Sequence, residues 1–295
     1  DFNVKSNSIA CGLNEILTYS FVSPRGVDKI NLPANDEKRN FVKIMNPLGE
    51  ETSVMRTTLI PNMLDVISTN ISHKVEEVSA FECGNTFIPQ EGLPIETKKY
   101  CVGMYGKEVD FFVLKGVIES VLNNVGLKGY EIEPETTNLT FHPGRCAKIV
   151  YNNIYIGTFG ELHPDVIENY NLGQRVYVAE INIDTVFENL NLTKSYNPLP
   201  KYPSTSRDIA LIVKDEVFVK QIEDIIKANG EDLVESYKLF DVYKGAQIEE
   251  GHKSIAYSIT YRSKDKTLTD EDVAKVHEKI LSELSEKLNA NLRSN

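Results

Sequence analysis

The stretch that decides the fold is Ser254-Ile255-Ala256-Tyr257-Ser258-Ile259-Thr260-Tyr261, near the end of a 295-residue chain. Large apolar side chains alternate there with small ones, which is the period of two of a strand with one buried face. Outward from it, the residues from 208 to 214 are apolar on both faces, and those from 233 to 243 read as another strand. The sequence therefore predicts three strands of one sheet.

Two amphipathic helices are predicted between these strands. Apolar residues recur at helical spacing from Phe218 to Ile226, and Asn229-Gly230 supplies a stop signal. A longer apolar stripe runs from Val273 to Leu288, preceded by Thr269 and Asp272 in the spacing of a capping box. A last short strand is expected at Leu292-Arg293. The order βαββαβ predicts a ferredoxin-like domain, with one antiparallel sheet and both helices on one face.

Such a sheet leaves its second face free, and RNA-binding modules of this topology stack bases on aromatic side chains there. Three tyrosines are candidates to stand on or near that face: Tyr243, Tyr257 and Tyr261. Strand tyrosines also pack against helices, and small-molecule regulatory domains share this topology. The pattern alone therefore leaves RNA and a small ligand open as partners.

A segment with three prolines, Tyr196 to Pro203, predicts a stiff extended connector, because proline fixes φ and has no amide donor. The predicted domains are residues 1–195, a linker at 196–203, and residues 204–295. The first reads as an α+β domain with a mixed or antiparallel sheet and flanking helices. Its helices are expected at Arg56–Ser72 and 112–127, and its strands at 99–104, 147–151, 154–159 and 176–183.

Composition excludes several classes of function. The formal net charge of −11 argues against general nucleic-acid binding, because neutralising phosphates takes an excess of Lys and Arg. No run of 18 apolar residues is present, so no membrane span is expected, and the N-terminus shows no secretory signal. The four cysteines are far apart, which predicts free thiols in a reducing cytoplasm and no metal site.

Five short strings in register give the second domain a specific resemblance. They are residues 202–210 (YPSTSRDIA), 239–245 (LFDVYKG), 251–257 (GHKSIAY), 266–273 (KTLTDEDV) and 292–293 (LR). In this order the domain resembles the ferredoxin-fold anticodon-binding domain of the bacterial phenylalanyl-tRNA synthetase β subunit. Upstream strings, including Asn46-Pro47-Leu48-Gly49-Glu50 and His142-Pro143-Gly144-Arg145, resemble that subunit's class II synthetase-like domain. The chain is similar to a C-terminal segment of the subunit, without its editing module.

The first domain is expected to be catalytically inactive. A class II synthetase site holds ATP and an aminoacyl-adenylate, and this requires arginines on the phosphates. The resemblance places one such position at Ala80-Phe81-Glu82 and the other at Gly157-Thr158-Phe159-Gly160-Glu161, and neither contains an arginine. The resemblance therefore implies no catalytic residue, metal or cofactor in this segment, with ATP and magnesium used by a partner α subunit.

The resemblance also implies the partners and their contact residues. The expected partners are phenylalanine tRNA and the α subunit of an (αβ)2 heterotetramer that attaches phenylalanine to its tRNA, with no DNA and no membrane. The anticodon contacts carry over to Ala210, Asp241, Tyr243 and Ser254, with Lys244, Lys253 and Arg262 as candidate phosphate contacts. The expected subunit interface comprises Met45, Asn46, Pro47, Met55, Arg56 and Leu59, with Arg56 either in a buried ion pair or at a helix cap. Asp241 could instead stabilise the following turn. Two other hypotheses are an amino-acid-binding regulatory protein with an ACT-like C-terminal domain, and a structural paralogue without a tRNA role.

Overall fold

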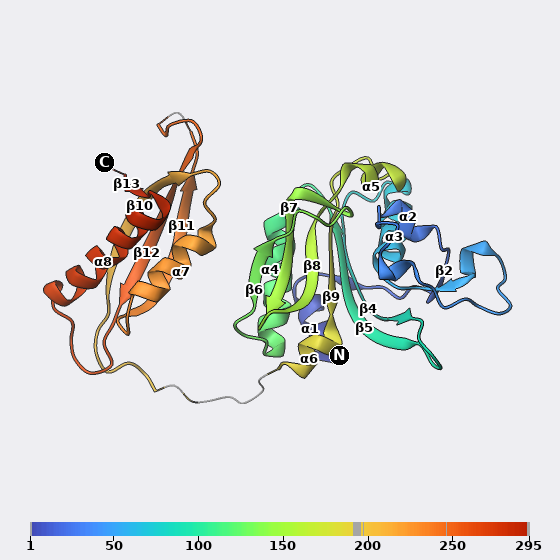
Figure 1. Ribbon diagram of the computed structural model, residues 1–295, viewed down its shortest axis with the longest axis horizontal. Coiled ribbons are helices and arrows are strands. Elements are labelled where there is room, and N and C mark those ends of the chain that lie inside the picture. Colours follow the sequence, from blue (N-terminus) through green and yellow to red (C-terminus); the bar gives the residue numbers. More distant parts are fainter. Residues whose placement is uncertain (1, 191–195, 197, 246, 294–295) are drawn as a thin grey trace. The chain divides into compact units, whose positions relative to one another are not determined.

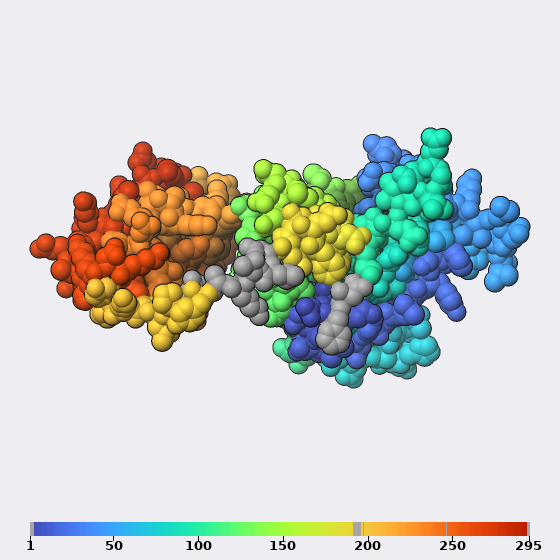
Figure 2. All heavy atoms as spheres, turned by 90° about the horizontal axis from the view of Figure 1, so that it is seen from below, coloured from blue at the N-terminus to red at the C-terminus, as the bar shows by residue number. Residues whose placement is uncertain are grey.

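The computed structural model describes residues 2–190, 196, 198–245 and 247–293. The chain divides into two compact units, residues 1–194 and 195–295. In the space-filling view the first unit runs from blue to yellow, and the second is mostly orange and red (Figure 2). The boundary was predicted between residues 195 and 196. Residues 191–195 and 197 lie outside the described part of the chain.

A seven-stranded sheet forms the centre of the first unit, in the order β1-β4-β5-β9-β8-β7-β6. Its neighbouring strands are antiparallel except for the parallel pair β1–β4. The strands are β1 (Asn14–Glu15), β4 (Val78–Ile88), β5 (Ile95–Tyr105), β6 (Glu131–Pro134), β7 (Phe141–Tyr151), β8 (Ile154–Leu162) and β9 (Tyr177–Asn182). A separate two-stranded ladder joins β2 (Phe21–Val22) to β3 (Val54–Met55).

Helices cover both faces of this sheet (Figure 1). One core contains residues of α1 (Phe2–Ala10), α4 (Phe111–Val125) and α6 (Ile183–Glu188). The core on the other face contains residues of α2 (Gly26–Lys29), α3 (Ile60–Ser72) and α5 (Pro164–Asn169). Short 3-10 turns lie at Glu37–Arg39 and Glu50–Thr52.

The two helices predicted for this unit are confirmed as α3 and α4. Pro61 lies in the first turn of α3, where its missing amide donor costs no helical hydrogen bond. The Asp110 side chain accepts from Val113 N and caps the start of α4, and Gly126 ends it at a φ of 101°. Three of the predicted strands lie within β5, β7 and β8, and the fourth, predicted at 176–183, extends one residue beyond β9 at each end. Neither α1 nor most of β4 was predicted.

The second unit has the predicted βαββαβ order and the sheet order β11-β12-β10-β13. Its elements are β10 (Thr205–Lys214), α7 (Val219–Asn229), β11 (Val234–Tyr243), β12 (His252–Tyr261), α8 (Asp270–Leu288) and β13 (Asn291–Leu292). Both helices pack on the same face of the sheet (Figure 1). The capping box at the start of α8 is confirmed, with Thr269 Oγ1 accepting from Asp272 N and the Asp272 carboxylate accepting from Thr269 N.

None of the helices among the described residues has the length and apolar character needed to cross a membrane.

Candidate nucleic-acid interface

Strand register determines which side chains of the second unit stand on the face opposite the helices. The alternating residues Ile255, Tyr257, Ile259 and Tyr261 of β12 are buried in the core beneath α7 and α8. Because side chains alternate along a strand, Ser254, Ala256, Ser258 and Thr260 stand on the opposite face, which we call the free face. The same argument places Ala210 there from β10, since Ile209 and Leu211 belong to the core.

Directly opposed residues in neighbouring strands share one face of a sheet. Ala210 is opposite Ala256, and Ala256 is opposite Asp241 of β11. Tyr243 is opposite Ser254. A bulge between Leu239 and Asp241 moves β11 by one residue, so that Asp241 and Tyr243 face away from the helices although Leu239 packs toward them. The four residues predicted to contact the anticodon therefore lie together on the free face.

The Tyr243 ring is held from more than one side. A Cβ atom added at Gly245 would lie 2.5 Å from Tyr243 Oη, so the ring lies against a position that only glycine leaves open. The guanidinium of Arg293 lies over the ring, with Cζ 5.5 Å from its centroid. Ser254 is only 2% exposed and Ala256 only 6%, although the described helices α7 and α8 both lie on the other face. The small side chains of β12 beside the aromatic ring are therefore covered by their neighbours on the sheet.

Two of the three candidate tyrosines are not on this face, which corrects the sequence-based prediction. Tyr257 and Tyr261 are fully buried, and their hydroxyls bond Glu223 and the Nδ1 atom of His277 on the helices, at 3.3 and 2.9 Å. Both belong to the apolar phase of β12, so the alternation that identified the strand also assigns them to the core. Burial raises the pKa of Tyr261 to about 12.

The predicted phosphate contacts are already engaged within the unit. Lys244 forms an ion pair with the Asp215 carboxylate, and Lys253 Nζ donates to the backbone oxygen of the same residue at 2.8 Å. Burial, together with the nearby Lys244, lowers the pKa of Lys253. Arg262 bonds Glu235 at 2.9 Å and Tyr202 O at 2.5 Å. It follows the last residue of β12, eight positions beyond Ser254, which corresponds to about 26 Å along the strand.

In the first unit, the carboxylate at the first of the two positions named by the resemblance is buried and paired with an arginine of the same unit. Glu82, on β4, is fully buried and accepts from Arg56 Nη1 at 2.8 Å and from Thr18 Oγ1 at 2.6 Å. Arg56 also donates from Nε to Asn85 O at 2.9 Å. A Cβ atom at Gly84 would lie 2.2 Å from Arg56 Nη2, so the guanidinium occupies the space above that glycine.

Two further carboxylates on this sheet are also paired within the unit. Glu180, on β9, accepts from Thr58 Oγ1 at 2.6 Å and from Leu59 N at 2.7 Å. Glu161, at the second position where an arginine was expected, receives two bonds from Arg145 at 2.6 and 2.8 Å. Burial acts to raise the pKa of Glu161, but Arg145 outweighs it and the net shift is downward. Arg56 and Arg145 therefore bind carboxylates of the protein's own sheet.

The predicted subunit-interface residues separate into two groups. Met45 is 91% exposed, and Asn46 and Pro47 are exposed beside it. Arg56 is 3% exposed and Leu59 is buried, so their side chains make contacts inside the unit, and Met55 is half-buried. Of the two roles considered for Arg56, the structure has the buried ion pair, and both partners belong to the first unit. Arg56 does not cap the following helix, because the N-cap of α3 is Leu59.

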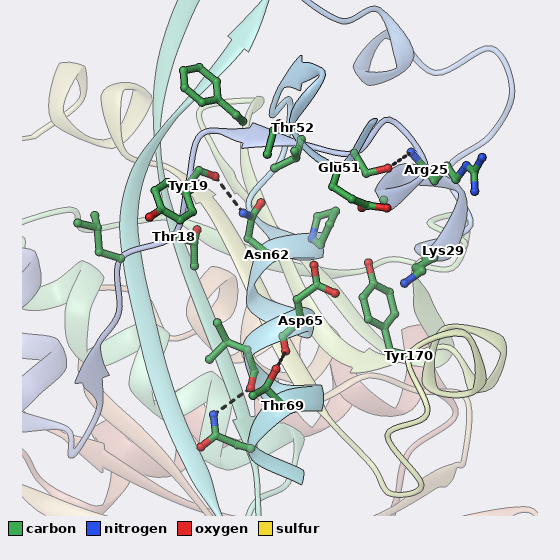
Figure 3. Close-up of a pocket in the computed structure, with 18 residues that line it drawn as sticks. Thr18, Tyr19, Arg25, Lys29, Glu51, Thr52, Asn62, Asp65, Thr69 and Tyr170 are labelled. Atoms are coloured by element: carbon green, nitrogen blue, oxygen red, sulfur yellow. Dashed lines mark hydrogen bonds between the residues drawn. The ribbon is translucent and has the colours of Figure 1, made fainter. Parts of the chain in front are cut away.

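A cleft of about 760 Å³ beside α3 was not predicted (Figure 3). Lys29 lies over the ring of Tyr170, 5.0 Å from its centroid, and Asp65 of α3 lines the same cleft. Burial raises the pKa of Asp65. Among the described residues, Tyr170 Oη and Asn62 Oδ1 are buried without a hydrogen-bond partner. The lining comes from several segments far apart in the sequence, which is why no local motif signalled it.

A known family model matches each of the two units. A family model described as the phenylalanyl tRNA synthetase beta chain CLM domain matches residues 2–183. A second model, the ferredoxin-fold anticodon binding domain, matches residues 200–293.

Similar proteins include the phenylalanine–tRNA ligase beta subunits of Clostridium tetani and Clostridium acetobutylicum, each 47% identical over 288 residues. Those alignments cover 97% of this chain and 36% of each relative. The beta subunit of Moorella thermoacetica is 37% identical over 295 residues, covering 96% of this chain and 37% of the relative. The chain thus spans a little over a third of the length of these relatives. On the match of both units, the chain belongs to the family of phenylalanine–tRNA ligase β subunits.

Proposed function

We propose that the second unit binds the anticodon loop of phenylalanine tRNA on its free face. The observation that carries the proposal is the grouping of Tyr243 with Asp241, Ser254 and Ala210 on the side of the sheet that no helix covers. An aromatic ring beside small residues gives an unpaired base a surface to stack on and room to approach the strands.

The polar groups around the ring suit recognition of a base edge. Asp241 is exposed, and its carboxylate accepts hydrogen bonds from amino and imino groups, as a guanine edge would offer. Ser254 both donates and accepts. The negative charge of the chain limits binding through phosphates alone, so base contacts supply much of the selectivity. Lys244 would contribute only if a phosphate displaced the Asp215 carboxylate, and Lys253 only if a phosphate displaced the Asp215 backbone oxygen.

The first unit, in this proposal, supports catalysis without performing it. Helices cover both faces of its sheet, and its buried Arg56 forms an ion pair with Glu82. An α subunit would bind phenylalanine, ATP and magnesium, and the two subunits would assemble in the cytoplasm as an (αβ)2 heterotetramer that attaches phenylalanine to its tRNA. Met45, Asn46 and Pro47 are exposed and are the proposed subunit contacts that remain accessible. The alternative of an amino-acid-binding regulatory protein finds no support in the comparisons.

The test is Tyr243→Ala, with Tyr243→Phe as the conservative variant. Loss of base stacking is worth about 1–3 kcal/mol, so Tyr243→Ala should weaken binding of phenylalanine tRNA by about 5- to 160-fold, while Tyr243→Phe binds like the parent. Affinity is measured by fluorescence anisotropy at one fixed salt concentration, because binding through phosphates varies with salt. Equal affinity of parent and Tyr243→Ala would exclude this face as the binding site.

The absence of chemistry is tested separately, by ATP–pyrophosphate exchange with phenylalanine. The chain alone should give no exchange above background. Addition of an α subunit should restore exchange, and Tyr243→Ala should leave that restored rate unchanged.

A further inference from the structure

Arg293, the last residue that the structure describes, reaches over the free face. Its Cζ atom lies 5.5 Å from the centroid of the Tyr243 ring, and its Nη2 atom donates to Gln247 Oε1 at 2.9 Å. Its backbone N donates to Ala210 O at 2.9 Å. The backbone is therefore fixed to the edge of the sheet, while the described residues hold the side chain through a ring contact and one neutral hydrogen bond.

The position of Arg293 follows from the strand register. Leu292 pairs with Leu211, so the next residue along lies opposite Ala210, in agreement with the backbone bond. Arg293, Ala210, Ala256 and Asp241 then form one row across the sheet. The distance from β13 to β11 is three strand spacings, or about 14 Å. Two alanines in the middle of the row leave the space through which the arginine extends toward Tyr243.

We propose that Arg293 is a further RNA-contacting residue, which covers the Tyr243 ring in the free protein and moves to receive an unpaired base between its guanidinium and that ring. This inference rests on the proposed function and names a residue beyond the four discussed above. A guanidinium is planar and stacks on π-systems, so it can pack on one side of a base while tyrosine packs on the other.

The present spacing requires the side chain to move. Bases stack about 3.4 Å apart, so a base between two planar groups needs them about 6.8 Å apart. The Cζ atom of Arg293 is 5.5 Å from the ring centroid, which is shorter than this spacing, so the guanidinium must move away before a base can enter. Breaking the single side-chain bond to Gln247 would free it, and the backbone bond to Ala210 would stay intact. The positive charge would then lie beside the RNA backbone, on a face that also contains Asp241.

The test uses the 295-residue chain and the anticodon stem-loop of phenylalanine tRNA, with 2-aminopurine at each anticodon position in turn. Stacking quenches 2-aminopurine fluorescence, and anisotropy of an end-labelled loop gives the affinity. Arg293→Ala should bind about tenfold more weakly, lose part of the quench at one position, and reduce the slope of log K against log salt by about 0.7. Arg293→Lys should keep the salt slope of the parent but lose quench, because the ammonium is not planar.

Arg207→Ala is the matched control, because Arg207 pairs with Asp270 at the start of α8 on the helix side of the sheet. It should bind within twofold of the parent. The inference is overturned if Arg293→Ala binds as tightly as the parent or more tightly, or if Arg207→Ala loses as much affinity. If Arg293→Ala fails to fold, Arg293→Lys takes its place, and a quench equal to that of the parent in Arg293→Lys overturns the inference. A parent chain that shows no binding would count against the proposed function as a whole, whereas a parent weakened by Tyr243→Ala but unaffected at Arg293 would remove this inference alone.

Discussion

Replacement of Glu82 by glutamine should destabilise the first unit more than any exposed substitution. The carboxylate is fully buried, and it accepts a charged bond from Arg56 and a 2.6 Å bond from Thr18. Glutamine keeps the shape but removes the charge, so the guanidinium of Arg56, 3% exposed, is left buried without a counter-ion. Breaking a buried pair in this way costs about 3–5 kcal/mol.

That cost is a large fraction of the total, since domains are stable by only about 5–15 kcal/mol. For a unit of this size each kcal/mol lowers the melting temperature by about 2–4 °C, so Glu82→Gln should lower it by roughly 6–20 °C. Glu161→Gln is the control, because its partner Arg145 has a side chain 40% exposed that water can solvate. It should cost about 1 kcal/mol or less.

The assay is a urea titration followed by amide hydrogen exchange, which separates the units within one chain. Protection of β4 reports the first unit, and protection of β12 reports the second and should not change. A loss below about 1 kcal/mol in Glu82→Gln, or a loss as large in Glu161→Gln, would refute the argument that Arg56 depends on the buried carboxylate of Glu82 as its counter-ion.

Three further predictions concern titration, reactivity and the shape of the free face. Burial, with Arg207 nearby, lowers the pKa of His277 in the folded state, so the unfolded chain binds the proton more tightly. The stability of the second unit should therefore fall as the pH drops below about 6.5, and less so in His277→Gln, as measured by urea unfolding at several pH values. Gly245→Ala should displace the Tyr243 ring and weaken RNA binding with little change in melting temperature, because the added Cβ would lie 2.5 Å from Oη. Burial raises the pKa of three thiols, so iodoacetamide at pH 8 should label them only on unfolding, as mass spectrometry would show: Cys83 (to about 11), Cys146 (to about 12) and Cys101.

Local periodicity was sufficient to predict the second unit almost completely. Strand β12 has a clear period of two and both helices have a period of 3.6, β10 contains a run that is apolar on both faces, and the capping box at Thr269 fixes the start of α8. The orientation of Tyr257 and Tyr261 was also available from the alternation, since they share the phase of Ile255 and Ile259. The bulge at Leu239 to Asp241 was not, because nothing in the local sequence marks the extra residue.

Long-range pairing limited the prediction in the first unit. Arg56 and Glu82 are 26 positions apart, and only the folded sheet brings them into contact. The sequence shows that no arginine lies next to Glu82. It does not show that Arg56, which precedes α3, pairs with Glu82 in the folded unit. The same holds for Arg145, which reaches Glu161 from the neighbouring strand β7. An arginine missing from a local motif is therefore no evidence that its glutamate is unpaired.

The proposed location of RNA binding rests on how each sheet is covered. The sheet of the first unit has a helical layer on both faces, and the described carboxylates Glu82, Glu161 and Glu180 are satisfied by partners within the unit. Exposing Glu82 would break an ion pair that is buried on both sides, at a cost of about 3–5 kcal/mol. The sheet of the second unit has helices on one face only. Its free face is covered over Tyr243 by the side chain of Arg293, which is far less costly to move. A stacking ligand would reach Tyr243 by displacing that side chain, and this is where the proposal places the anticodon.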